Sequence, residues 1–255
     1  MAFQNILPDP FNAITPHGEV TNSGSNAAFN PVTAVGYATI QVGSNQKIMK
    51  DRTNSGIVVT RATAYHMFTA SIAYNPMPKS FHDILYSFLM DKQASLRPFY
   101  VSLPQNTTFS GGAEASSKHS IKIAQVAGAR QLLLEDSGGE DNITVTVGDM
   151  FNVVDSNGLA VNSHTKAYQV TRVEEHGAIS SSLTSTTAGA TTPNSGQLQK
   201  RITFTPSLQK SVTTSEFVEV GKPKLFVLQT GNVQTYSLNA DNLYSLSVKV
   251  EEACF

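Results

Sequence analysis

The sequence predicts a mainly β fold with one α-helix, divided by an inserted small antiparallel β-barrel domain. Only one stretch, residues 80–92, repeats apolar residues at helical spacing, whereas many shorter runs alternate apolar and polar residues with the strand period of two. The last such run, residues 244–251, needs a partner sheet for its apolar face. We therefore expect it to pair with strands from the beginning of the chain.

The helix is expected over residues 80–92, with Ser80 as its N-cap and Asp83 completing a capping-box-like pair. Pro98 excludes helix from the following run, so residues 99–103 are predicted to form a strand. An exposed apolar face this wide would be a liability, which places the helical stripe in the core. The stripe comprises Phe81, Ile84, Leu85, Phe88 and Leu89.

Residues 1–38 are predicted to form an extended N-terminal arm, because four prolines exclude a long helix or a central strand. Two alternatives are open: a free tail, or an arm that docks on a neighbouring subunit. Large apolar residues favour docking, since a disordered tail has few of them. These residues are Phe3, Ile6, Leu7, Phe11 and Phe29.

The next stretch predicts a strand at residues 37–42, turns at 43–45 and 52–56, and a long strand over 57–74. In the long strand one face should be buried, while the other is wet or contacts a partner. The first face carries Phe68, Ala70, Ile72 and Tyr74, and the second carries Thr69, Ser71 and Ala73.

A Ser/Thr/Gly-rich stretch at residues 104–118 predicts a domain boundary. Beyond it, short strands expected at 132–134, 143–147, 150–154, 168–173 and 202–206 predict a small antiparallel barrel over residues 113–216. Residues 178–196 are uncharged and Ser/Thr-rich, which predicts a mobile loop. This loop is either a contact tip for a partner protein or a tolerated surface insertion.

Further strands at residues 217–220, 225–228 and 233–238 are predicted to return to the first domain. In the closing run, the polar face carries Ser245, Ser247, Lys249 and Glu251. The predicted main domain is therefore split: residues 39–104 plus 217–252 carry helix 80–92, and the barrel is inserted between them.

Composition excludes several classes of protein. The net charge is −1 and charged residues make up 15% of the chain, so no basic stripe indicates nucleic-acid binding. The single cysteine, Cys254, cannot form an internal disulfide. Without a signal-peptide pattern or an apolar run of about 20 residues, we expect no membrane insertion. We interpret the glycosylation sequons at Asn106 and Asn142 as chance matches.

No catalytic, cofactor-binding or metal-ligating residues are predicted. No two histidines have the i, i+4 spacing of a helical metal site, and neither a nucleophile elbow nor a phosphate-binding loop is present. We expect His66 to be a core or interface residue and His82 to lie on the wet side of the helix. The acidic turn around Gly138 and Gly139 lacks the order of a calcium loop, and is more consistent with a solvated loop. A chain without Trp and with few charges is also a poor candidate for a glycosidase, so we predict that it is not an enzyme.

Two stretches carry a family resemblance. The first stretch reads DRTNSG, followed by TRATAYHMFTASIAYNPMPKSFHDILYSFLMDKQASLRPFYVSLP. It is similar to the N-terminal half of distal tail proteins and related tail-hub proteins of tailed bacteriophages. There a T-x-S-G turn precedes a long strand, a Pro-interrupted approach to a helix, and another strand. The second stretch resembles the inserted module of that group, through the segments VGDMFNVVDSN, TKAYQVTRVEE and RITFTPSLQKSV. The end of the chain resembles the group's closing strand, through the segment NLYSLSVKVEEA.

The resemblance implies a tail-tube-like β-sandwich or barrel that forms a homo-oligomeric ring, a hexamer, in the virion tail. The implied ring sits at the distal end of the tail tube and continues the DNA channel. Its partners would be itself, the tail tube protein and baseplate hub or tail fibre proteins, with genomic DNA passing only transiently. Loop 178–196 is longer than the loop expected for members of the group. Some relatives bind an iron–sulfur cluster through several cysteines, which this chain cannot do, so no cofactor is expected.

Several alternatives stay open at this point. Either polar face, Thr69/Ser71/Ala73 or Ser245/Ser247/Lys249, could line the lumen or a subunit interface. The chain could be another tail-tube or tail-completion ring protein. It could instead carry a barrel that binds host-surface carbohydrate, although the barrel's aromatic residues, Phe151, Tyr168 and Phe204, occupy core-like positions. A tail-associated hydrolase is the enzymatic alternative.

Overall fold

The computed structural model describes residues 5–8, 12–14, 20–22, 36–103, 117–135, 143, 145–156, 164–175, 199–221, 223–231 and 235–253. It is mainly β with one helix, which confirms the predicted fold class. The chain divides into two compact units, one formed by Met1–Ser102 with Leu225–Phe255, and the other by Leu103–Lys224.

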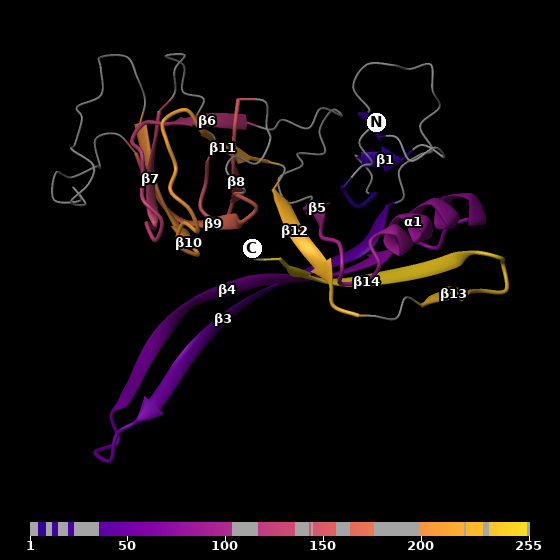
Figure 1. The fold of residues 1–255 in the computed structure, drawn as a ribbon, viewed down its shortest axis with the longest axis horizontal. Coiled ribbons are helices and arrows are strands. Elements are labelled where there is room, and N and C mark those ends of the chain that lie inside the picture. Colours follow the sequence, from indigo (N-terminus) through magenta and orange to yellow (C-terminus); the bar gives the residue numbers. More distant parts are fainter. Residues whose placement is uncertain are drawn as a thin grey trace. The chain divides into compact units, whose positions relative to one another are not determined.

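An open sheet forms the first unit (Figure 1). Its strand order is β3-β4-β14-β12-β5, with the short strand β13 also paired to β14. A separate two-stranded hairpin joins β1 (Asn12–Ile14) and β2 (Val20–Asn22). The sheet strands are β3 (Tyr37–Arg52), β4 (Val58–Tyr74), β5 (Phe99–Ser102), β12 (Lys224–Gln229), β13 (Tyr236–Leu238) and β14 (Tyr244–Glu252).

The closing strand pairs with an early strand, as predicted. β14 runs antiparallel to β4, with Lys249 opposite Ser71 and Val250 opposite Ala70. The predicted alternation of β4 is also confirmed: Phe68, Ala70, Ile72 and Tyr74 are buried, and the residues between them are partly exposed. One face of this sheet is therefore core.

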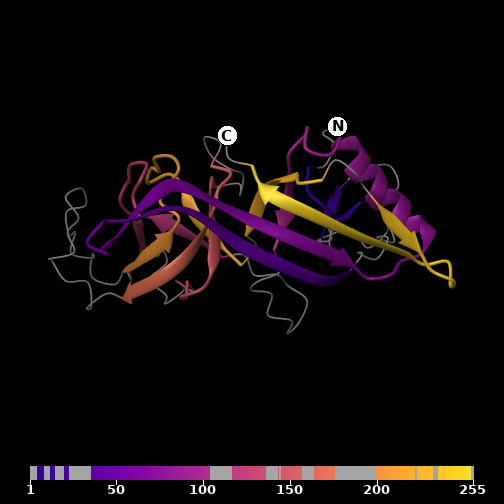
Figure 2. The same ribbon diagram turned by 90° about the horizontal axis from the view of Figure 1, so that it is seen from below.

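Helix α1 (Lys79–Asp91) lies along β14, as Figures 1 and 2 both show. The predicted cap is wrong. Pro78 is the N-cap, with no side-chain hydrogen bond, and its carbonyl accepts the N–H groups of Phe81 and His82. The fixed φ of proline suits it to this position without help from Ser80 or Asp83. After Lys92, the left-handed residues Gln93 and Ala94 end the helix.

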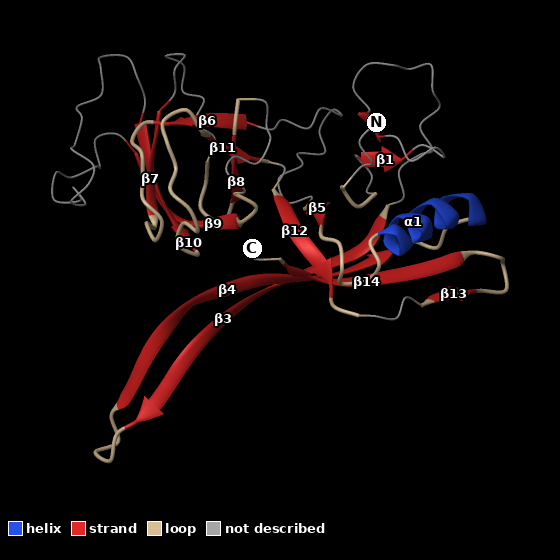
Figure 3. Ribbon diagram, in the orientation of Figure 1, coloured by secondary structure: helices blue, strands red, loops and turns tan. Residues whose placement is uncertain are grey.

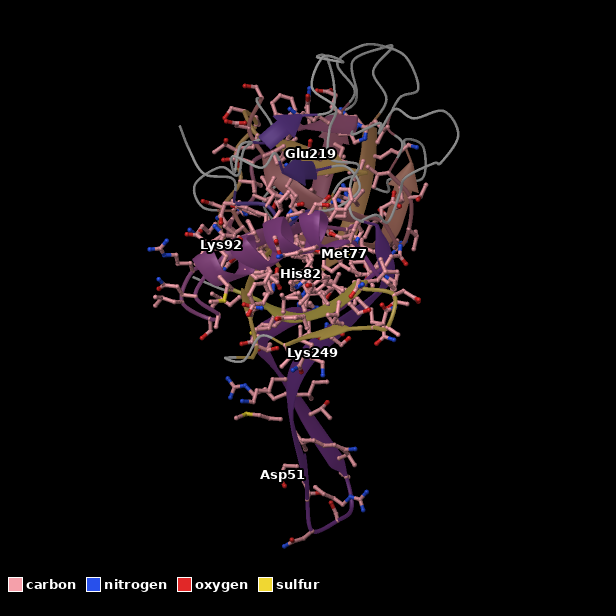
Figure 4. The ribbon with its side chains drawn as sticks, turned by 90° about the vertical axis from the view of Figure 1, so that its right-hand side faces the viewer. Asp51, Met77, His82, Lys92, Glu219 and Lys249 are labelled. Carbon is pink, nitrogen blue, oxygen red and sulfur yellow. The ribbon has the colours of Figure 1, made fainter. Side chains whose placement is uncertain are left out.

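The prediction that His82 faces water is wrong. Its side chain is buried, with 3% of the residue exposed. The ring stacks on Tyr86 and Tyr244 and meets the edge of Tyr236. Strands β13 and β14 supply two of these tyrosines, so the burial depends on a sheet that helical periodicity does not reveal. Figure 4 shows His82 among crowded side chains.

The predicted turn at residues 43–45 is also wrong, because β3 continues through it. Gly43, Ser44 and Asn45 pair with residues of β4, so backbone hydrogen bonding overrides their turn propensity. The actual turn lies at residues 53–56, as the sequence predicted. There the Gly56 N–H donates to the Thr53 carbonyl, and Gly56 has a positive φ of 84°.

Six antiparallel strands of the second unit close a barrel, which confirms the predicted small antiparallel barrel (Figure 3). Their order is β10-β7-β6-β11-β8-β9. The barrel core centres on Phe151, Tyr168 and Phe204, whose rings touch each other. The strands are β6 (Ser117–Ile121), β7 (Gln131–Glu135), β8 (Met150–Val154), β9 (Ala167–Glu175), β10 (Gln199–Thr205) and β11 (Phe217–Val220).

Two strand predictions for this part of the chain are wrong. β11 belongs to the barrel, where it pairs with β6 on one side and β8 on the other, and does not return to the first sheet. Ile143 and Val145 are buried without forming a strand, and Val147 is exposed in a turn. The described units divide after Ser102 and after Lys224, whereas the sequence placed the barrel at 113–216.

Several predicted features lie outside the described residues. These are loop 178–196, the turn at Gly138 and Gly139, Cys254, and both sequon asparagines, Asn106 and Asn142. Within the described residues, no helix has the length and apolar character needed to cross a membrane.

Candidate functional site

The most exposed part of the open sheet is the far end of the β3–β4 hairpin, residues 46–61, which we call the distal ribbon. β14 pairs with β4 from the Thr69–Glu251 pair to the Ala73–Ser247 pair. From there toward the turn of the hairpin, β3 and β4 pair with each other. Every residue of the distal ribbon is exposed. A two-stranded hairpin alone is marginally stable in water, and this one is therefore a candidate for covering by a partner.

Large apolar side chains lie on both faces of the distal ribbon. Ile48 and Met49 are neighbours in β3, so they point to opposite faces. Met49 is 63% exposed and Ile57, next to the turn, is 64% exposed. Val58 and Val59 repeat the pattern in β4. Contiguous exposed apolar groups mark interaction sites, so both faces of the distal ribbon are candidate contact surfaces.

The distal ribbon is also basic, although the whole chain has a net charge of −1. The distal ribbon contains four basic residues, Lys47, Lys50, Arg52 and Arg61, and one acidic residue, Asp51. The Asp51 carboxylate accepts the backbone N–H of Arg52 at 2.7 Å, within the ribbon itself. Figure 4 shows side chains projecting from both sides of the hairpin near Asp51. A partner surface with acidic groups at its rim would suit this charge.

The two polar faces that the sequence left as alternatives are one surface. In the sheet, Ala73 lies opposite Ser247 and Ser71 opposite Lys249, so all four side chains share a face. Gln41 extends the same face onto β3, because it lies opposite Ser71. We call this surface the polar face: Gln41, Gly43, Thr69, Ser71, Ala73, Ser245, Ser247, Lys249 and Glu251, the last of which lies opposite Thr69.

A hollow of about 430 Å³ lies on the polar face, and Lys249 is the one charged residue in its lining. Gly43 helps to shape it, because a Cβ at this position would come within 2.8 Å of the Thr69 Oγ1 atom. Hydroxyl, amide and ammonium groups can donate hydrogen bonds to a passing polar ligand. The lining holds no carboxylate or imidazole for acid–base chemistry.

The two outer strands of the open sheet differ. β3 is the last strand at one side, whereas β5 at the other side is covered by residues 5–8 of the same chain. The Leu7 N–H donates to the Tyr100 carbonyl at 2.8 Å, and the Tyr100 N–H donates to the Asn5 carbonyl at 2.7 Å. Leu7 is fully buried, and the Tyr74 hydroxyl donates to the Pro8 carbonyl at 2.9 Å.

This contact excludes a free tail for residues 5–8, while docking of the arm on a neighbouring subunit stays a prediction. Burying a leucine contributes about 1.5–3 kcal/mol, and the three hydrogen bonds that hold the strand contribute about 0.5–1.5 kcal/mol each. Ordering four backbone residues costs about 1–2 kcal/mol each. The covering strand is therefore held near balance and can detach.

His66 and Glu252 are buried and make contacts within the open sheet. His66 is buried, with Nε2 2.9 Å from Ser44 Oγ and its ring against Phe68, as expected of a core histidine. A Glu252 Oε2 atom accepts the Phe68 N–H at 3.0 Å. Among the described residues, no group of three or more His, Cys, Asp or Glu side chains could hold a metal ion.

Two buried histidines, His119 and His164, were not singled out by the sequence. His164 is 1% exposed, and its Nε2 atom lies 3.3 Å from the Ser211 carbonyl oxygen. Burial lowers the pKa of His164, because it disfavours the charged imidazolium; the Ser211 carbonyl partly opposes this shift. A lone histidine in a loop gives no sequence signal for such burial.

No known family model matches this chain, and no curated protein matches it. The resemblance to phage distal tail proteins therefore rests on the sequence motifs alone.

Proposed function

We propose that this chain is a structural protein of a bacteriophage tail. Copies assemble into a ring, a hexamer, at the distal end of the tail tube, link the tube to the baseplate or tip hub, and continue the DNA channel. The observation that carries the proposal is the distal ribbon, a long hairpin with apolar groups exposed on both faces. The motif resemblance supplies the viral context.

A ring of copies would cover the outer edge of the open sheet. β3 presents a long outer edge, and such an edge invites pairing with another chain unless it is covered. Head-to-tail contacts close into a ring when the rotation between copies closes. Neighbouring copies would then cover both faces of each distal ribbon and leave no long edge in water.

The polar face is our candidate for the lumen. It is built mainly from hydroxyl, amide and small side chains, with two charged groups of opposite sign, Lys249 and Glu251. Strong cationic walls would bind DNA phosphates tightly and slow passage. A weakly charged wall lets DNA slide. The proposed lumen wall includes residues from both polar faces that the sequence left as alternatives.

The carbohydrate-binding alternative is less well supported. Sugar recognition needs exposed aromatic platforms, but Phe151, Tyr168 and Phe204 are buried in the barrel core. A second tail role, as another tail-tube or tail-completion ring protein, uses the same surfaces. Co-assembly separates the two: a distal tail protein binds both tube and hub proteins, whereas a tube protein extends into a cylinder with its own copies.

Electron microscopy of the purified full chain tests the proposal. We expect closed rings of six copies with a central channel, and rings capping the tube when tail tube protein is added. A monodisperse monomer at high concentration, without rings and without assembly on tube protein, contradicts it. Glycan-array binding would favour the carbohydrate alternative, and clearing of peptidoglycan or capsule in a zymogram would favour a hydrolase.

A further inference from the structure

The covering of β5 by residues 5–8 points to an exchange between copies. We propose that the outer edge of β5 is a receptor for the strand Asn5–Pro8 of a second copy, so that adjacent copies in the assembly are linked by this strand. The inference rests on the proposed function in one respect, because it needs neighbouring copies. The strand itself, and the site that receives it, are both present in the single chain.

The receptor has defined chemistry. It takes an extended segment in parallel register, with Ile6 bridged to Tyr100. Two backbone hydrogen bonds to Tyr100 hold the main chain, and a buried site accepts the leucine side chain at position 7. The Tyr74 hydroxyl fixes the Pro8 carbonyl at the end of the segment. Main-chain bonds with one side-chain anchor are the general mode of recognition by strand addition.

Exchange requires no new contact, because a second copy offers the same strand to the same edge. The interactions that hold the strand are few, and a single parallel bridge pairs less well than an antiparallel ladder. Residues 9–36 separate the strand from β3 in the sequence. At about 3.3 Å for each extended residue, a linker of this length spans on the order of tens of ångströms even with part of it folded into the β1–β2 hairpin.

Site-specific disulfides distinguish exchange from covering within one copy. In a C254S background, one full-length variant carries Ile6→Cys and another carries Tyr100→Cys, at positions that are bridge partners. The two are mixed at a concentration that gives assembly and are oxidised. We expect a covalent dimer between the two variants, at least tenfold more abundant than in a control mixture of Ile6→Cys with Val147→Cys, which lies in an exposed turn of the barrel and outside the distal ribbon.

Two further variants tie the dimer to the receptor. Adding Leu7→Asp to the Ile6→Cys chain should abolish the cross-link, because a charge cannot enter the buried site, whereas Leu7→Met should retain it. A mixed dimer no more abundant than the control overturns the proposal, whether or not a chain carrying both cysteines closes an internal disulfide. Rings without the cross-link refute exchange alone, and the cross-link without rings refutes the proposed ring.

Discussion

The two units of this chain meet the same problem, the unpaired edges of a β-sheet, in opposite ways. The barrel closes on itself, so each of its six strands is paired on both sides. The open sheet ends in β3 on one side, and extends a hairpin whose distal ribbon is exposed on both faces. Edges are removed by closure in the first case, and left for a partner in the second.

This difference separates stability from assembly. The barrel buries three aromatic rings against each other and has the features of a unit that folds without a partner. The distal ribbon buries none of its own residues. Changes in the barrel core should therefore act on folding, whereas changes in the distal ribbon should act on association.

The largest expected effect is the loss of a barrel ring. Phe204→Ala removes a side chain that is 1% exposed and touches both Phe151 and Tyr168. It should lower the free energy of unfolding of the barrel by about 3–5 kcal/mol. Denaturant-dependent hydrogen exchange of the barrel amides measures this loss.

The matched change in the distal ribbon is Ile57→Ala, at a residue that is exposed. It should change the unfolding free energy by less than about 0.5 kcal/mol. A large destabilisation from this variant, measured on the monomer, would break the comparison, because the ribbon would then contribute to folding.

The second prediction concerns association. Met49→Glu places a charge on the distal ribbon, where it should weaken self-association at least tenfold, since covering the ribbon would then desolvate a carboxylate at a cost that its cross-strand neighbour Arg61 does not offset. Val147→Glu is the control: Val147 is also 63% exposed, but it lies in a turn of the barrel. Sedimentation velocity over a concentration series measures both. Equal weakening by the two variants would refute the distal ribbon as the interface.

Whether a feature of either unit can be predicted from the sequence depends on how far apart in the chain the residues that determine it lie. The helix near residues 80–92 and the buried face of β4 follow from periodicity within a single element. The extent of β3 does not, because Gly43, Ser44 and Asn45 have turn propensity but pair with β4. The partners of β11 were mistaken for the same reason: a short apolar run fits either sheet, and long-range pairing decides between them.

The candidate site divides in the same way. The sequence identified both polar sets, but their union on one face depends on the register of β14 against β4. In the distal ribbon, the sequence predicted the turn at 52–56 and the strand from residue 57, but it assigned no strand to residues 46–51 and did not reveal that β14 stops short of the ribbon. The burial of His82 depends on tyrosines from β13 and β14, which lie far away in the sequence.

The third prediction is a pH effect confined to the barrel. The folded-state pKa of His164 is lowered by burial, so the unfolded chain binds a proton more readily than the folded chain. Stability from the neutral histidine is present above the unfolded pKa of about 6.5 and is lost as pH falls below it. Calorimetry between pH 8 and 5 should show the barrel transition move to lower temperature.

His164→Gln supplies the control for this effect, since an amide can donate to the Ser211 carbonyl without titrating. The barrel of this variant should be less stable at neutral pH but less sensitive to acid. An unchanged acid response would show that other groups cause the loss, and would remove His164 as the origin.

The smallest expected effects come from one chemical change made in each unit. Tyr168→Phe removes the hydroxyl oxygen that accepts the Gln209 N–H at 3.0 Å, and should lower barrel stability by about 0.5–1.5 kcal/mol. Tyr74→Phe removes the donor to the Pro8 carbonyl. This second loss should speed hydrogen exchange at the Leu7 amide several-fold and leave the exchange of β4 amides nearly unchanged.

Together, the variants Tyr168→Phe and Tyr74→Phe test whether the strand of residues 5–8 is a separate, weakly held element. In a closed barrel, a lost hydrogen bond is shared by the whole cooperative unit, so all barrel amides should respond together to Tyr168→Phe. At the β5 edge the loss should stay local, because residues 5–8 can detach while the sheet remains intact. If Tyr74→Phe instead slows or speeds exchange across β4 and β14 equally, the strand belongs to the sheet's cooperative unit, and it cannot exchange between copies without unfolding that sheet.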